Sequence, residues 1–109
     1  MNVRLYLWQR FTAMLMAPLV LVHLAVIIYA TRRGLSAADI LARTRGSVAW
    51  AAFYGTFVLA AAVHASIGVR TVLLEWTRWP AFRRDLSAVL VGLLLAALGV
   101  RAVAAVVLP

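Results

Sequence analysis

Three long apolar stretches, separated by two short polar segments, make up most of the chain. They cover about residues 11–31, 48–70 and 86–108. Each stretch holds roughly the twenty residues that a helix needs to cross the ~30 Å hydrocarbon core of a bilayer. Because backbone polar groups find no water in that core, each stretch must be helical. The pattern therefore predicts an all-α membrane protein with three transmembrane helices.

The polar segments carry the signals of helix ends. In GLSAADILARTRGS (residues 34–47), Ser36 is an N-cap for a short helix at the membrane surface. EWTRWPAFRRD (residues 75–85) is typical of an interfacial turn, since tryptophan suits the headgroup layer and Pro80 ends a helix. Pro18 removes one backbone hydrogen bond from the first helix and favours a kink there. No repeat or linker divides the chain, so one domain is expected over residues 1–109.

The first stretch resembles a signal peptide only superficially. Its apolar core is too long, and YATRRG (residues 29–34) is not a small-x-small cleavage site. We therefore expect this segment to be retained as a transmembrane helix.

Composition supports a membrane protein and excludes several kinds of site. The hydrophobic fraction is 66%, above the ~45–50% of soluble domains. The absence of cysteine excludes disulfides, thiolate metal sites and cysteine-ligated iron–sulfur clusters. The net charge of +8 comes from eleven arginines against three acidic residues. Because the arginines flank the apolar stretches, as juxtamembrane residues do, the charge argues against nucleic-acid binding.

The arginines also indicate an orientation. With the amino terminus inside, six arginines fall on the inner face and four on the outer face. The inner set is Arg4, Arg10, Arg70, Arg78, Arg83 and Arg84, and the outer set is Arg32, Arg33, Arg43 and Arg45. The positive-inside rule therefore favours an inside amino terminus.

Two histidines, His23 and His64, lie within the apolar stretches. Ionisable residues are expensive there and are candidates for function. One interpretation is that they hydrogen-bond neighbouring helices. The other is axial ligation of haem, because neutral imidazole binds iron and a helical bundle holds it at a fixed depth. Small residues around His64, from Ala60 to Gly68, would admit a flat macrocycle or a second helix.

Residue spacing places the two histidines at different depths. His64 is six residues from Arg70, or about 9 Å along a helix. His23 is thirteen residues from Arg10, or about 20 Å from the same face. A difference of roughly 10 Å favours two haems at two levels over one haem held by both rings. Each iron would then need a second ligand from a partner chain.

Arg101 is a charged residue within the third stretch. It lies fifteen residues from Leu86, or about 23 Å from the inner face of the membrane. Its side chain either snorkels outward or pairs with a haem propionate near His23. Arg43 and Arg45, in the outer loop, are further candidates for such a pairing.

Two motifs in a fixed order resemble a known family. QRFTAML (residues 9–15) is similar to an Arg-x-Ser/Thr-Gly/Ala signature at the start of a first helix. HASIGVRTVLLEW (residues 64–76) resembles a His-x-x-x-Gly pattern that ends in Asp-Tyr, with Glu75 and Trp76 in those two places. Together with the order of three helices, these motifs resemble the membrane-anchor subunits of succinate:quinone oxidoreductases and fumarate reductases, the respiratory complex II family.

The resemblance implies roles for particular residues. His64 would bind the iron of a haem on the inner side, and His23 indicates an anchor of the two-haem type. The implied haem pocket and propionate residues are Arg101, Arg43, Arg45, Ser66, Gly68 and Arg70. The implied quinone-binding residues are Arg10, Thr12, Glu75 and Trp76. Trp76 offers only an indole N–H where the family has a tyrosine hydroxyl, so it is equally well read as an interfacial anchor.

The resemblance also implies a function. The chain would form half of a haem-binding helical bundle with a second three-helix anchor, related or identical, in a bacterial-type inner membrane. It would dock flavoprotein and iron–sulfur subunits to the inner face through RWPAFRRD (residues 78–85) and pass electrons through haem b to a quinone. Succinate and fumarate would react on the other chains. The alternatives are a b-type cytochrome subunit of another dehydrogenase and a haem-free scaffold or transporter subunit, with histidines for packing or proton relay.

Overall fold

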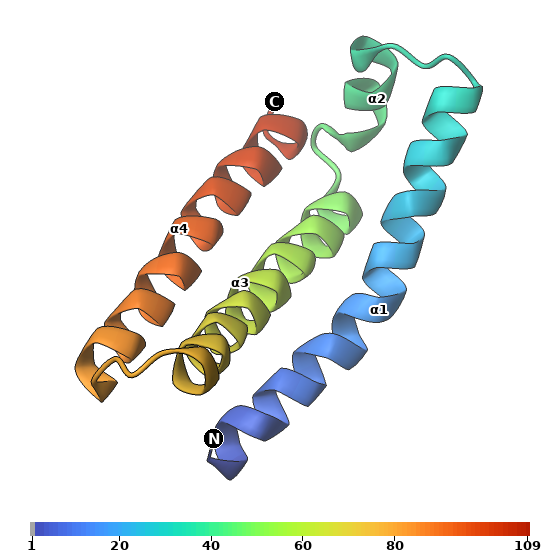
Figure 1. The fold of residues 1–109 in the computed structure, drawn as a ribbon. Helices are drawn as coiled ribbons and strands as arrows, with labels where there is room; N and C mark the ends of the chain where they lie inside the picture. The colour runs from blue at the N-terminus through green and yellow to red at the C-terminus, as the bar shows by residue number, and fades with distance from the viewer. Residues whose placement is uncertain (1) are drawn as a thin grey trace.

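The computed structural model describes residues 2–109, and that range folds into four helices without a strand. The helices are α1 (Val3–Arg32), α2 (Ala37–Thr44), α3 (Val48–Trp76) and α4 (Ala81–Val107) (Figure 1). Helices α1, α3 and α4 are long and apolar enough to cross a membrane. The predicted all-α class with three transmembrane helices is therefore confirmed.

The long helices differ from the predicted spans mainly at the membrane surfaces. Helix α1 begins at Val3 rather than near residue 11, α3 continues to Trp76, and α4 begins at Ala81 rather than near residue 86. Arginines in the α1 and α4 extensions, and Glu75 in that of α3, lower the local hydropathy without breaking a helix. At 1.5 Å per residue a helix of thirty residues is about 45 Å long, so its ends extend beyond the ~30 Å hydrocarbon core. Helix α1 also continues through Pro18.

Side chains cap the short helix α2, and Ser36 is its N-cap as predicted. The Ser36 Oγ accepts a hydrogen bond from the Asp39 N–H at 3.1 Å, and the Asp39 carboxylate accepts one from the Ser36 N–H at 2.9 Å. This reciprocal capping box satisfies two amides that the helix leaves free. The hydrogen bond from the Ser36 backbone is the main reason why the pKa of Asp39 lies below its usual value of 3.8.

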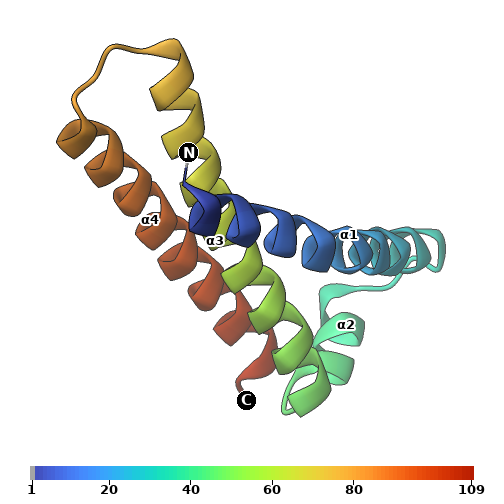
Figure 2. The same ribbon diagram turned by 90° about the horizontal axis from the view of Figure 1, so that it is seen from below.

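The three long helices form a small elongated bundle with α3 in the middle. Helix α4 runs along one side of α3, and α1 lies on the other side (Figure 1). The amino terminus and the 77–80 turn lie at one end of the bundle, whereas α2 and the carboxyl terminus lie at the other. Seen from below, α1 crosses α3 obliquely (Figure 2). The side of α3 that α1 crosses carries the residues of greatest chemical interest.

Small residues bring α3 and α4 close together. A Cβ added at Gly92 would lie 2.9 Å from the Ser66 Cβ, and one added at Gly99 would overlap the Val58 side chain. Ala62 and Ala88 are buried in the same contact region. Lipid tails are as apolar as leucine, so close van der Waals packing of this kind stabilises helix pairs in a membrane.

The connection after α2 is tied to the end of α4. The Thr44 hydroxyl donates to the Val106 carbonyl at 2.6 Å, and the Gly46 N–H donates to the Val107 carbonyl at 2.8 Å. The last carbonyls of a helix have no partner within the helix, so these bonds complete the end of α4. Gly46 has a φ of 73°, a left-handed conformation that glycine adopts without steric strain.

Replacing Gly99 with alanine should loosen the α3–α4 pair. The new methyl group would overlap the Val58 side chain, and overpacking costs about 1–3 kcal/mol. Gly55→Ala is the matched control, because nothing lies within 4 Å of its added Cβ. Thermal denaturation of the purified protein in detergent should show a lower midpoint for Gly99→Ala than for Gly55→Ala. Equal midpoints would contradict this packing.

Candidate functional site

His64 contacts α1 through a threonine. The Thr12 Oγ1 lies 3.1 Å from the His64 Nδ1, a pairing of side chains 52 residues apart. Thr12 is 3% exposed, and His64 is partly buried. The same hydroxyl lies 2.8 Å from the Trp8 carbonyl and 3.1 Å from the Gln9 carbonyl, one turn earlier in α1. This contact fixes where α1 crosses α3 and leaves the other ring nitrogen of His64 without a partner among residues 2–109.

His23 is held by aromatic side chains. Its ring meets Tyr54 and Phe57 of α3 edge-on, with ring centroids 5.8 and 5.7 Å apart. Its Nδ1 is buried and has no hydrogen-bond partner among the described residues. The histidine lines a hollow of about 270 Å³ that reaches Leu95 and Gly99 of α4. An unpartnered buried nitrogen beside such a hollow is a candidate for a ligand.

The two histidines lie at different levels of the bundle. The α3 residues beside His23 precede His64 by seven to ten positions, or about 10–15 Å along the helix. On α1, eleven positions separate His23 from Thr12, the partner of His64, or about 16 Å. The rings are therefore too far apart to bind the same iron atom. Within residues 2–109, no group of three or more His, Cys, Asp or Glu side chains could hold a metal ion.

Arg101 lies near the level of His23 but faces away from it. Gly99, two residues earlier, lines the hollow beside His23. Two residues correspond to a rotation of about 200° around a helix, and the Arg101 side chain is exposed. The structure thus places Arg101 near the level of His23, as the residue spacing in the sequence indicates. It does not bring the two side chains together within one chain.

The arginines near α2 lie at the same end of the bundle as His23. Arg43 lines a second hollow, of about 380 Å³, together with Tyr29 and Tyr54. Tyr54 also contacts His23, so this hollow adjoins the one beside the histidine. Arg45, the C-cap residue of α2, is exposed.

Of the three pocket residues proposed near His64, only Gly68 lies on the same side of α3. A Cβ at Gly68 would lie 3.6 Å from the Gln9 amide of α1. Ser66 instead faces α4, where its hydroxyl donates to the Ala88 carbonyl at 2.8 Å. Arg70 pairs with Asp85 of α4 at 2.9 Å, although its Nη1 is buried without a partner.

The four proposed quinone residues do not form one cluster. Thr12 is buried against His64. Arg10 is exposed on α1, with its guanidinium 5.8 Å from the Tyr6 ring. Glu75 and Trp76 are exposed at the end of α3, and Trp76 is 81% exposed. Arg10, Glu75 and Trp76 are thus accessible to a ligand or to another chain at the end that holds the amino terminus.

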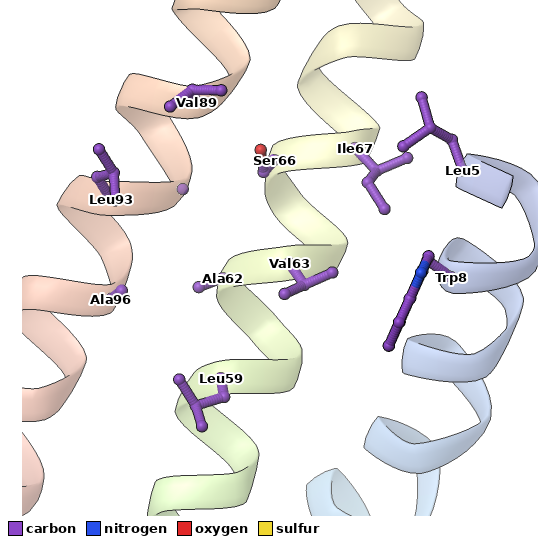
Figure 3. A pocket seen from close by; sticks show the side chains of 11 residues that line it. Leu5, Trp8, Leu59, Ala62, Val63, Ser66, Ile67, Val89, Leu93 and Ala96 are labelled. Atoms are coloured by element: carbon purple, nitrogen blue, oxygen red, sulfur yellow. The ribbon is translucent and has the colours of Figure 1, made fainter. Parts of the chain in front are cut away.

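A groove of about 510 Å³ lies among α1, α3 and α4 (Figure 3). Its walls are almost entirely apolar, and no titratable side chain lines it. Trp8 lies on the α1 side of the groove, while Ser66 lies on the α4 side of α3 (Figure 3). The groove offers apolar contact area but no group for chemistry.

Several residues of the site were not identified from the sequence. They are Gln9, whose Oε1 is buried without a partner, the aromatic pair Tyr54 and Phe57, and Asp85, the partner of Arg70. The aromatic pair has the i, i+3 spacing of a single helix face, which is a usable signal. Gln9 directly precedes the arginine of the first motif, but nothing in the sequence around it predicts that its side chain is buried at the site.

Ser66→Ala should weaken the α3–α4 contact. Removing one interhelical hydrogen bond in a membrane bundle costs about 0.6 kcal/mol on average. Ser87→Ala is the matched control, since Ser87 has no side-chain hydrogen bond among residues 2–109. We expect Ser66→Ala to lower the thermal midpoint slightly and Ser87→Ala to leave it unchanged. Equal midpoints for the two variants would show that the Ser66 bond adds nothing to stability.

Comparison with known proteins identifies the family. The family model described as the succinate dehydrogenase/fumarate reductase transmembrane subunit matches residues 2–104. Comparison with curated proteins and with solved structures gave no match. The family match covers nearly the whole chain, including both histidines, helices α1 and α3, and most of α4. This chain therefore belongs to the family of succinate dehydrogenase/fumarate reductase transmembrane subunits.

Proposed function

We propose that this chain is a haem b-binding anchor that docks a flavoprotein and an iron–sulfur subunit and transfers electrons between the iron–sulfur subunit and a membrane quinone. The observation that carries the proposal is the placement of its two histidines. Each lies within a membrane-spanning helix, at its own depth, without a second histidine at that level. Such residues are expensive in a membrane and are retained for function.

The residues around each histidine fit an axial ligand. His64 uses one ring nitrogen for Thr12 and has the other free. His23 is oriented by two aromatic edges and lines a hollow between helices. Haem, when bound, supplies a one-electron carrier inside the membrane. The chain itself holds the imidazoles at fixed depths, His23 among aromatic and apolar side chains and His64 against the Thr12 hydroxyl.

Each haem needs a second ligand from another chain. The separation of His23 and His64 prevents both from binding one iron. The sequence has no other histidine and no cysteine, and no methionine within residues 2–109 is buried. A second three-helix anchor, related or identical, would complete both sites. Arg43, Arg45 and Arg101 are proposed for the propionates at the His23 level. Arg101 faces away from His23 of its own chain. It would therefore pair with a propionate of a haem held mainly by the partner anchor, or with a propionate that lies across the interface between the two anchors.

The inner end of the bundle is proposed as the docking surface for the other subunits. It carries exposed Arg78 within the 77–80 turn and exposed Arg83 after it, with the Arg83 guanidinium 5.3 Å from the Trp79 ring centroid. We place this end and the amino terminus on the inside of a bacterial-type inner membrane, as the arginine count favours. Arg10, Glu75 and Trp76 lie at the same end and are proposed for quinone contact. Gly68 and Arg70 are assigned to the haem pocket at the His64 level, whereas Ser66 is assigned to helix packing.

The haem proposal predicts two haems for each pair of anchors. The reduced-minus-oxidised spectrum of the purified complex should show b-type bands. His23→Ala and His64→Ala should each lower the haem content from two to one per pair, because each variant removes a ligand at one level only. Leu21→Ala, at an exposed position on α1, is the control and should retain both haems.

Two results would contradict the haem proposal. A wild-type complex without b-type bands would favour a haem-free scaffold. Unchanged haem content in His23→Ala would show that the second level does not exist. A third result would leave haem binding intact but change the assigned complex. If b-type bands are present but the complex does not turn over succinate or fumarate, the chain is a cytochrome subunit of another dehydrogenase.

Reversing charge at the inner end should weaken docking. Arg78→Glu combined with Arg83→Glu places negative charge on the proposed surface, and like charges across an interface disfavour binding. Arg32→Glu combined with Arg33→Glu makes the same change at the opposite end. Succinate dehydrogenase activity should appear in the soluble fraction for the first pair of substitutions and remain on membranes for the second. Equal release from both would place the docking surface elsewhere.

A further inference from the structure

We infer that Thr12 is a positioning residue that fixes the tautomer of His64, so that Nε2 is the nitrogen presented to iron. The inference rests on the proposed haem function and reassigns Thr12, which the sequence placed at the quinone. The Thr12 side chain is buried and its oxygen is bonded on two sides. The Thr12 hydroxyl therefore has no hydrogen left to donate to a quinone carbonyl.

Counting hydrogens decides which atom donates. A threonine hydroxyl carries one hydrogen and two lone pairs. Its nearest neighbour is the Trp8 carbonyl at 2.8 Å, which can only accept, and threonines in membrane helices commonly donate to the carbonyl four residues earlier. The hydroxyl hydrogen is therefore committed to α1. The 3.1 Å contact with His64 then requires the histidine Nδ1 to carry the hydrogen and donate it.

The hydrogen bond at one ring nitrogen determines the chemistry of the other. A neutral imidazole with its hydrogen on Nδ1 has a free lone pair on Nε2. Ligating histidines generally donate their second N–H to an oxygen, which fixes the ring and raises its basicity as a ligand. Thr12 supplies that oxygen here, and the Trp8 carbonyl in turn holds Thr12. The chain Trp8–Thr12–His64 thus connects the backbone of α1 to a ligand on α3.

His23 has no equivalent arrangement. Its Nδ1 is buried without a partner among the described residues, and aromatic edges rather than an oxygen surround its ring. The inner and outer levels therefore differ in how the ligand is oriented. A change at Thr12 should affect only the haem bound by His64.

The test uses three variants. Thr12→Val keeps the shape of the side chain and removes the oxygen, whereas Thr12→Ser restores a hydroxyl. Thr71→Val is the matched control, because the Thr71 hydroxyl also donates to the carbonyl four residues earlier, at 3.0 Å, but has no histidine partner. All three are measured in the full chain and in the assembled complex.

The first measurement does not need haem. Nitrogen NMR of the full chain, labelled in its two histidines and reconstituted without haem in lipid nanodiscs, reports which ring nitrogen carries the hydrogen. His64 of the wild type, Thr12→Ser and Thr71→Val should be the Nδ1–H tautomer. Thr12→Val should show a mixture. An Nε2–H tautomer in the wild type would overturn the inference while leaving the two-haem proposal to be judged by its spectrum.

The second measurement uses the complex. Loss of a partner of this kind lowers metal affinity by about 10- to 100-fold, so Thr12→Val should lose the inner haem on dilution or competition with apomyoglobin. The haem that remains bound should have a higher midpoint potential, since a less basic ligand stabilises ferric iron less. Thr12→Ser should restore both properties. Unchanged haem affinity and potential in Thr12→Val would overturn the inference, because a merely structural threonine would alter stability alone.

Discussion

The absence of water in the hydrocarbon core is the constraint on which the rest of the structure depends. A polar group buried there finds no water to bond, and several hydrogen bonds between elements of residues 2–109 supply such a partner within the protein. Thr44 and Gly46 complete the end of α4, and Ser66 reaches from α3 to α4. The contact between Thr12 and His64 satisfies a hydroxyl and an imidazole together. The polar residues of the spans are therefore the points at which the helices are positioned.

The same constraint explains why the two helix pairs differ. Helices α3 and α4 approach closely through Gly92 and Gly99, and the serine between them serves packing. Helix α1 crosses α3 obliquely (Figure 2), and the contact at the crossing is polar on both sides. Van der Waals contact thus stabilises one pair along its length, whereas the other pair combines the Thr12–His64 hydrogen bond with the aromatic contacts of His23. A side chain held at such a crossing is well placed to keep a fixed depth and orientation.

The sequence predicts the helices well because hydropathy along one chain is a local property. It also predicts the depth of a residue, since rise per residue is constant in a helix. It predicts poorly which way a side chain faces once three helices have packed. Arg101 has the expected depth but lies about 200° around α4 from the residue that faces His23. Ser66, two positions after His64, faces the opposite neighbour for the same reason. Thr12 and His64 are 52 residues apart, and no spacing rule joins them.

The distribution of exposed residues bears on what surrounds this chain. Among residues 2–109, only five hydrophobic residues are buried, while large apolar side chains are exposed along all three spans. In a bilayer, lipid covers such faces at little cost, so the exposure of apolar side chains alone does not require a partner chain.

The buried polar atoms that have no hydrogen-bond partner do require one. The atoms Gln9 Oε1, His23 Nδ1, Arg70 Nη1 and Arg84 Nε are buried, yet no atom within residues 2–109 satisfies them. Lipid tails offer no hydrogen bond, so these atoms need a ligand, a bound water or a neighbouring chain. Three of them lie toward the end of the bundle that holds the amino terminus, and the fourth belongs to His23. The unmet polar groups thus lie at two levels of the bundle, where a neighbouring chain of the kind proposed above would supply partners.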